Sequence, residues 1–400
     1  EVLPLPFRIA VLFQLGVHLW HAMVWVCYHI YRVNCLALLN LSYSNYNYTL
    51  DGHAKGIVSG LMASIAPADP MENVVLIRGI RATAQKLFSA LAVCLVGCWV
   101  CRWLVDENSM IYPLIINGLS IFVLCYSFYV AFGRGKSMGQ QRVHSTVFRV
   151  LAGKINSESM RTNDIFFSDG LTSYAKVLND LACYIWITFV TSNSLYNTRV
   201  EALVLSYPQL VRMKQCLYEY KTTQKKQHIF NFLNYTALLG PIIVNMLIKL
   251  SILKLGSEKE ISTTNLDTLN WWWFVTSFAS SFYLFIWDVR MDWGLGLLEP
   301  LFKSRSKYEP LRAGRLVYGK PALYYTMILI NLVLRVVWVF KIFVIMETEI
   351  ELGLRHRVGN FLFGYNFLLA GYVILETLEL LRRWLWCLLK WENDLAKLHN

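Results

Sequence analysis

The sequence contains little charge for its length. Only 16% of its 400 residues are charged, whereas 56% are hydrophobic, and its mean hydropathy is +0.41. Water-soluble proteins of this size carry more charge and fewer apolar residues. The composition therefore excludes an ordinary soluble protein and predicts an all-α fold, a polytopic bundle of membrane-spanning helices.

The motifs of common enzymes are absent from the sequence. It contains no GxSxG, no HExxH and no nucleotide-binding fingerprint. The tripeptide "GKS" at 135–137 resembles the end of a phosphate-binding loop, but the glycine required five residues earlier is Val130. We therefore expect a protein that is not an enzyme and that needs no cofactor.

Clusters of metal-binding side chains are also scarce. His18 and His21 have helical spacing and no nearby carboxylate, which favours buried or interfacial histidines over a metal site. Cys94, Cys98 and Cys101 also follow helical spacing, without a second CxxC or a histidine. Because thiols are common small apolar groups in buried positions, we interpret these cysteines as structural and expect no metal site.

Acidic residues are fewer than basic ones, 26 against 38, which gives a net charge of +12. In a membrane protein such a surplus is typical of cytosolic loops near anionic lipid, rather than of nucleic-acid binding. The loops richest in Lys and Arg are 134–163, 221–227 and 290–320, and they alternate with more acidic loops. This alternation predicts a cytosolic C-terminus, a luminal or external N-terminus and a luminal loop at 254–268.

We expect about nine transmembrane helices, because a helix crosses a bilayer with about 20 apolar residues. The fifth segment is the weakest, since it contains Pro208, Arg212 and Lys214. An interfacial amphipathic helix is the alternative for that segment. The nine expected spans are 7–31, 87–105, 110–132, 165–191, 200–220, 229–252, 269–289, 322–345 and 359–389.

The charges inside the last span require an explanation. A charge at mid-bilayer costs about 2.5–3.5 kcal/mol on insertion scales, yet this span holds Glu376, Glu379, Arg382 and Arg383. Glu379 precedes the two arginines by three and four residues, which predicts contact on one helix face. Glu379 would then hold one arginine, while the other offers its donors to phosphate or a carboxylate. The alternative is that both arginines reach the cytosolic interface.

Polar residues recur at helical spacing in other spans. Asn331, Arg335 and Trp338 follow one stripe of the eighth span, and Arg335 lies deep within it. Polar contacts between helices would explain any single stripe. Several stripes with deep cations together favour a polar path for an anion. The other positions are Asp169, Ser173, Lys176 and Asp180 in the fourth span, Asn234 and Tyr235 in the sixth, and Asp288 and Asp292 ending the seventh.

Three stretches together resemble a known family. In chain order, "YLFIWDVRMDWGL", "YYTMILINLVLRVVW" and "LELLRRWLWCLLKWEND" are similar to the C-terminal signatures of the EXS family. This family comprises membrane proteins related to the eukaryotic phosphate exporter that also serves as a retrovirus receptor. The resemblance covers about 160–396. The opening "LPLPFRIAVLFQLGVHLW" and the stretch "SDGLTSYAKV" look most like the short fungal branch, a Golgi protein whose loss causes secretion of resident endoplasmic-reticulum proteins.

The resemblance implies a Golgi membrane transporter. It would return inorganic phosphate, released in the lumen by sugar-nucleotide glycosylation, to the cytosol. Residues 161–400 would form the EXS-type transport domain, and 1–160 would add N-terminal transmembrane helices with cytosolic loops. Carried over by motif, the phosphate-binding residues of the family fall on Asp288, Arg335, Arg382 and Arg383, with Trp338 matching an aromatic gate.

The chain departs from the exporters at two places. Ser173 and Lys176 stand where exporters carry an Asp and an Asn, and Asn234 stands where they carry a Lys before the tyrosine, here Tyr235. We therefore hypothesise that Lys176 replaces the missing lysine of the phosphate site. Glu379 and Asn331 are expected to support that site.

The runner-up function belongs to another class. A non-transporting sorting or scaffold protein would retain glycosyltransferases or resident proteins by binding their tails or adaptors. The expected partners are therefore phosphate and membrane lipid, with glycosyltransferases or their sorting adaptors in the second case, and no nucleic acid. The oligomeric state stays open between a monomer and a homodimer.

Overall fold

The fold is known from a computed structural model. It describes residues 4–33, 35, 70–106, 109–133, 138–156, 161–190, 196–255, 263–298, 310–311, 316–342, 358, 361–362 and 370–399, and all structural statements below concern these residues. Within them the chain forms helices and no strand, which confirms the all-α prediction. The "GKS" tripeptide lies outside the described residues.

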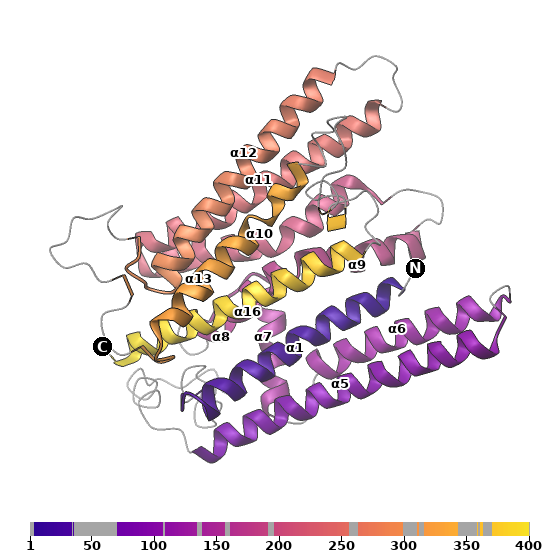
Figure 1. Ribbon diagram of the computed structural model, residues 1–400, viewed down its shortest axis with the longest axis horizontal. Helices are drawn as coiled ribbons and strands as arrows, with labels where there is room; N and C mark the ends of the chain where they lie inside the picture. The colour runs from indigo at the N-terminus through magenta and orange to yellow at the C-terminus, as the bar shows by residue number, and fades with distance from the viewer. Residues whose placement is uncertain are drawn as a thin grey trace. The chain divides into compact units, whose positions relative to one another are not determined.

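The chain divides into two compact units, of which the first is Glu1–Ser168. In it α1, α5 and α6 pack side by side (Figure 1). Apolar residues dominate this packing, with a buried hydrogen bond of 3.1 Å from Gln14 Nε2 to Ser127 Oγ. The helices of this unit are α1 (Leu5–His29), α5 (Pro70–Leu104), α6 (Ile111–Phe132), α7 (Met138–Leu151) and the first part of α8 (Arg161–Ser173).

The second unit is Asp169–Asn400 and contains most of the sequence-predicted site. Its helices α10, α11 and α12 pack in series, and α13 lies against α16 (Figure 1). The α-helices that follow α8 are α9 (Ala175–Ile185), α10 (Thr198–Thr223), α11 (Lys226–Leu255), α12 (Thr263–Trp287), α13 (Pro321–Arg335) and α16 (Ala370–His399).

Five helices of the described residues are long and apolar enough to cross a membrane, and the prediction of nine spans is not confirmed. They are Leu5–His29, Asn73–Leu104, Ile111–Phe132, Lys226–Leu253 and Pro321–Lys341. The other four expected spans contain helices, but α10 and α16 carry charges in their interiors, and α12 is rich in Trp, Ser and Thr. The fourth expected span is divided at Tyr174, which lies between α8 and α9.

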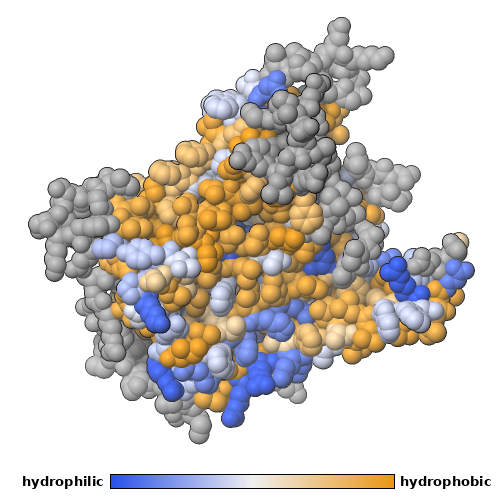
Figure 2. All heavy atoms as spheres, in the orientation of Figure 1, coloured by the Kyte–Doolittle hydropathy of each residue, from blue (hydrophilic) through white to orange (hydrophobic). Residues whose placement is uncertain are grey.

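Apolar side chains also cover the outside of the helices. Trp103 is 77% exposed and Phe278 is 63% exposed, and hydrophobic residues form a broad surface on the face shown in Figure 2. Apolar surface of this extent is unfavourable in water but not against lipid chains. The surface therefore agrees with the membrane character that the composition predicts.

Irregular helical turns follow three helices of the second unit. The five-residue π-helices η1 (Trp186–Val190) and η2 (Asp288–Asp292) extend α9 and α12. After α13 ends at Arg335, the chain tightens into the 3₁₀ turn η4 (Val337–Lys341). Such departures from α-helical geometry are often found where a membrane or soluble helix carries function.

Candidate functional site

Arg382 is fixed on α16 by Glu379, one turn earlier. Its Nε and one terminal nitrogen donate to the two carboxylate oxygens of Glu379 at 2.8 and 2.5 Å. Arg382 is buried, whereas the side chain of Glu379 keeps 37% of its surface exposed. The bidentate geometry removes most of the rotational freedom of the guanidinium, so this arginine is held in place.

Arg383 has a different set of partners. It donates to two hydroxyls of α8, at 3.0 Å to Ser173 Oγ and at 3.1 Å to Thr172 Oγ1. Its guanidinium carbon lies 4.7 Å from the ring centre of Trp386. Ser173 Oγ in turn donates to Glu379 at 2.7 Å, so one hydroxyl connects the two neighbouring arginines.

Arg335 reaches the same region from the end of α13. Its guanidinium donates to Asp288 Oδ2, on the π-helix η2, and both side chains are nearly buried. Asn331 lies one turn before Arg335 and joins the two ion pairs. Its amide nitrogen donates to Asp288 at 3.2 Å, and its amide oxygen accepts from Arg382 at 3.4 Å.

We call these residues the arginine cluster: Arg335, Arg382 and Arg383 with Asp288, Asn331, Glu379, Ser173 and Thr172. Its charges do not cancel. Asp288 neutralises Arg335 and Glu379 neutralises Arg382. Among the described residues no carboxylate forms an ion pair with Arg383. The Nε atom of Arg335 is buried and has no hydrogen-bond acceptor among the described residues.

A further buried arginine, Arg212 on α10, was not among the predicted site residues. It is 2% exposed, and its Nε lies 2.8 Å from Asp169 and 3.0 Å from the Tyr235 hydroxyl. The Tyr235 hydroxyl donates to Asp169 at 2.5 Å. The Tyr235 hydroxyl therefore already binds both Asp169 and Arg212. The signal for Arg212 was present, because a charge inside an expected span needs a partner.

Two predicted site residues, Asn234 and Lys176, lie outside the arginine cluster. The amide oxygen of Asn234 is buried without a hydrogen-bond partner in the described part of the chain. Lys176 is exposed, whereas Ser173 is buried. Tyr174 separates the two helices α8 and α9 here, and among the described residues Lys176 makes no contact with the arginine cluster.

Trp338 lies on the 3₁₀ turn η4, directly after Arg335. Its indole nitrogen donates to Ser281 Oγ at 2.9 Å, and its ring meets the ring of Trp273 edge-on, with centres 5.9 Å apart. Lys341, at the end of the same turn, lies over the other tryptophan, with Nζ 4.1 Å from the Trp273 ring centre. Trp273 therefore contacts both Trp338 and the ammonium group of Lys341.

Two more lysines accompany Lys341. Lys176 and Lys249 lie within electrostatic range of it, and Lys249 is paired with Glu201 at 2.6 Å. Lys341 itself lies 3.5 Å from the side-chain oxygen of Asn245. We call Lys176, Lys249 and Lys341 the lysine group. Sequence reasoning found only the first of them, although Lys341 follows Arg335 within the same span.

The three sequence stretches that resemble the EXS family contact one another. Gly294 has a φ of +62°, and a Cβ there would lie 2.5 Å from Asn393 Oδ1. Asn393 donates to the backbone oxygen of Asp292 at 2.7 Å, and Trp386 donates to the Asp292 carboxylate at 3.3 Å. The "DWG" and "EN" elements thus hold η2 against α16, which positions Asp288 in the arginine cluster.

Comparisons with known proteins identify the family of the chain. The EXS family model matches residues 3–396. Protein ERD1 homolog 1 of Schizosaccharomyces pombe is 26% identical over 309 residues, covering 73% of this chain and 70% of that protein. Protein ERD1 of Saccharomyces cerevisiae is 31% identical over 192 residues, covering 48% of this chain and 47% of that protein.

Similarity extends to animal proteins. Solute carrier family 53 member 1 of Mus musculus is 23% identical over 303 residues, covering 71% of this chain and 39% of that protein. The matched region thus spans less than half the length of the mouse and budding-yeast proteins. The family match, in contrast, includes nearly every residue of this chain, and the protein therefore belongs to the EXS family.

Proposed function

We propose that this protein conducts inorganic phosphate through its second unit, with the arginine cluster as the binding site. Membership of the EXS family and similarity to a protein named as a solute carrier support a transport function. In the cell we place this activity in the Golgi membrane, where it would return luminal phosphate to the cytosol. Lower luminal phosphate would support glycosylation and, through it, retention of resident proteins.

The observation that carries the proposal is the unequal pairing of Arg382 and Arg383. A cation inside a bundle of apolar helices is costly unless an anion compensates it. Glu379 forms a direct ion pair with Arg382 and acts on Arg383 only at longer range, whereas the described direct contacts of Arg383 are two neutral hydroxyls and the Trp386 ring. A bound phosphate would supply the missing negative charge.

The remaining residues would keep the site ready for an anion. Asp288 fixes Arg335 and Glu379 fixes Arg382, so little side-chain entropy is lost when phosphate binds. Phosphate oxygens would accept from the Arg383 guanidinium, whereas the Ser173 hydroxyl, which donates to Glu379, could join them only by releasing that carboxylate. The buried Arg335 Nε is a further donor without an acceptor among the described residues. Such a donor set suits a tetrahedral oxyanion with several acceptor sites.

The path would continue past Trp338 to the lysine group. Trp338 and Trp273 lie between Arg335 and Lys341 along a chain of observed contacts. Because η4 is a 3₁₀ turn, a small change in its geometry would move the Trp338 ring. We therefore assign Trp338 the role of a gate. Lys341, rather than the exposed Lys176, would supply the second cation beyond it.

Phosphate flux in proteoliposomes tests the proposal. The purified chain is reconstituted with radiolabelled phosphate inside, and efflux is compared with that of protein-free liposomes. The exposed Lys221 on α10 provides a matched control, since Lys221→Gln removes a positive charge away from the arginine cluster. We expect efflux from wild type and Lys221→Gln alike. Efflux equal to that of empty liposomes would contradict transport and favour a sorting or scaffold function.

A further inference from the structure

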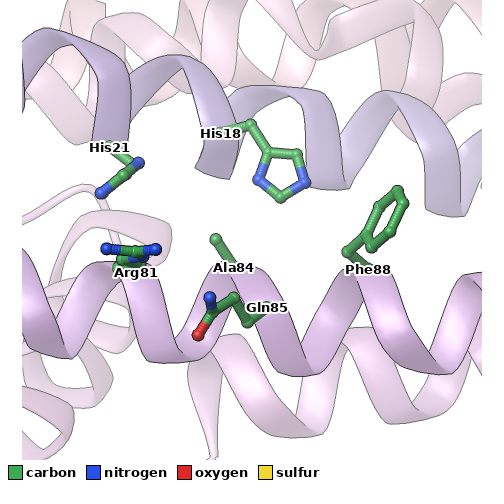
Figure 3. Close-up of a pocket in the computed structure, with 6 residues that line it drawn as sticks. All are labelled: His18, His21, Arg81, Ala84, Gln85 and Phe88. Carbon is green, nitrogen blue, oxygen red and sulfur yellow. The ribbon is translucent and has the colours of Figure 1, made fainter.

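A second group of polar side chains lies in the first unit, between α1 and α5. Here the two helices leave a pocket of about 280 Å³. Figure 3 shows two histidines reaching from α1 toward an arginine and a glutamine on α5, with a phenylalanine at one side. The lining residues are His18, His21, Arg81, Ala84, Gln85 and Phe88.

Helical spacing explains why these residues face one another. On α5, Arg81, Gln85 and Phe88 are separated by four and three residues, which keeps them on one face. His18 and His21 share a face of α1 in the same way. Ala84, between the polar residues, is 5% exposed and too small to fill the space opposite the histidines. The pocket thus follows from a small residue set among larger polar ones.

The polar groups of this pocket have few partners in the part of the chain that the structure describes. The Nε2 atom of His21 is buried without a hydrogen bond. In the described part of the chain, Arg81 forms no ion pair and Gln85 no hydrogen bond. His18 contacts the Phe88 ring, with centres 6.4 Å apart. Four side chains able to donate hydrogen bonds therefore converge on one space whose lining contains no carboxylate.

These donors favour an anion as the ligand. A guanidinium offers a planar pair of donors, and two imidazoles and an amide add more from other directions. An arrangement of this kind matches a phosphate group, which has several acceptor oxygens and negative charge. Arg81 is exposed and carries the fixed positive charge of this lining, so a negatively charged ligand gains an ion pair that a neutral ligand cannot form.

The position along α5 indicates where that phosphate lies. Arg78, Arg81 and Lys86 fall in the first half of α5, and the apolar part begins at Leu87. From Leu87 to Leu104 the helix is about 27 Å long at about 1.5 Å per residue, close to the ~30 Å of hydrocarbon in a bilayer. The pocket therefore lies where the apolar part of α5 begins, and its two histidines lie within the apolar helix α1.

We infer that the pocket formed by His18, His21, Arg81 and Gln85 binds a phosphate group. The phosphate belongs either to a lipid headgroup or to free inorganic phosphate, since both present the same oxygens. Phe88 and the apolar residues after it would contact the acyl chains of a lipid. This site is separate from the arginine cluster, and it does not depend on transport by that cluster.

The test measures binding to the full chain in phosphatidylcholine nanodiscs. One arm adds radiolabelled phosphatidic acid, and phosphatidylserine serves as a lipid competitor of similar charge. The other arm adds radiolabelled inorganic phosphate. Both arms compare wild type with Arg81→Gln and with Arg78→Gln, which removes an exposed arginine one turn earlier that does not line the pocket.

We expect Arg81→Gln to weaken binding about tenfold or more, as loss of one charge-assisted contact does, while Arg78→Gln binds as wild type. An effect in the phosphatidic acid arm identifies a lipid phosphate, and weak competition by phosphatidylserine shows a preference for a phosphomonoester over a phosphodiester. An effect confined to the inorganic phosphate arm identifies free phosphate. Arg81→Lys keeps the charge but loses the planar pair of donors, so it should bind with intermediate affinity. Binding by this variant also shows that the protein folds with a substitution at position 81. Equal binding by Arg81→Gln and wild type in both arms would overturn the inference.

Discussion

Arg382 and Arg383 are neighbours in the chain, but their side chains make different contacts. Arg382 is held by two hydrogen bonds to Glu379, whereas Arg383 contacts two hydroxyls and a tryptophan ring. A helix turns about 100° per residue, so adjacent side chains point to different neighbours. One arginine can therefore support the structure while the next is available to a ligand.

Glu379→Gln tests the supporting role of the carboxylate. The amide oxygen can still accept from Ser173, but the charge that holds Arg382 is lost. We expect a free energy of unfolding lower by about 1–2 kcal/mol, since the exposed part of Glu379 is screened by solvent. Phosphate flux should fall less than on loss of Arg383. Thermal unfolding and flux are measured on the same preparation, and a stability equal to wild type would contradict the role.

The pair of Asp288 and Arg335 should be more sensitive, because both side chains are nearly buried. Asp288→Asn and Arg335→Gln each leave one charge uncompensated, which costs about 3–5 kcal/mol in buried pairs. The double variant should recover part of that loss, because it leaves neither charge behind. A double-mutant cycle on apparent melting temperatures measures this coupling. Strictly additive losses would show that the two side chains act independently.

Residue spacing predicted some of these contacts and not others. The separation of three residues between Glu379 and Arg382 was sufficient to predict their contact, because both lie on one helix. The pairing of Arg335 with Asp288 joins two helices, and no local pattern contains that information. Lys176 was expected beside Ser173, but it is exposed and lies within electrostatic range of Lys341. The phosphate-binding roles themselves stay predictions.

At the level of helices and turns, the irregular segments position the functional groups. The π-helix η2 carries Asp288 and Asp292, and its end is held by the contact between Gly294 and Asn393. Inserting residues into a helix changes the direction of every side chain that follows. The contact between the "DWG" and "EN" elements thus sets the orientation of Asp288 toward Arg335.

Two glycine variants separate backbone strain from packing at this contact. Gly294 and Gly319 both have positive φ, of +62° and +76°, but a Cβ at Gly319 would meet no atom within 4 Å. Gly319→Ala should therefore cost only the strain of about 1–2 kcal/mol. Gly294→Ala should cost more, since the Cβ would displace the buried Asn393 from its hydrogen bond. Equal losses of thermal stability for the two variants would contradict this packing role.

Helix prediction from apolar runs succeeded where the run was long and uncharged. Five of the expected spans meet that description, among them α1, α6 and α11. α10 and α16 do not, because their charges form ion pairs within the second unit, and these pairs replace part of the apolar surface. Average hydropathy does not register such pairing, so it cannot decide whether these helices cross.

For the whole molecule, the alternation of loop charge predicts an orientation in the membrane. The loops at 134–163, 221–227 and 290–320 are basic, and their side should be cytosolic together with the C-terminus. A C-terminal tag on the chain in sealed Golgi vesicles should therefore be removed by added protease. A tag placed in the loop 254–268 provides the control, since it should be protected until detergent is added. Protection of the C-terminal tag would contradict the predicted orientation.

Substitution of the arginine without a carboxylate partner tests whether the cluster binds phosphate. Arg383→Lys keeps the charge but loses the planar fork, and loss of one charge-assisted contact of about 1.5–3 kcal/mol lowers affinity roughly tenfold or more. Phosphate flux in proteoliposomes is measured for wild type, Arg383→Lys and Arg383→Glu, with protein amount and thermal stability determined on each sample. We expect a large reduction for Arg383→Lys and no flux for Arg383→Glu, at near-normal stability. Wild-type flux in both Arg383→Lys and Arg382→Lys would contradict phosphate binding and indicate arginines that only reach the membrane surface.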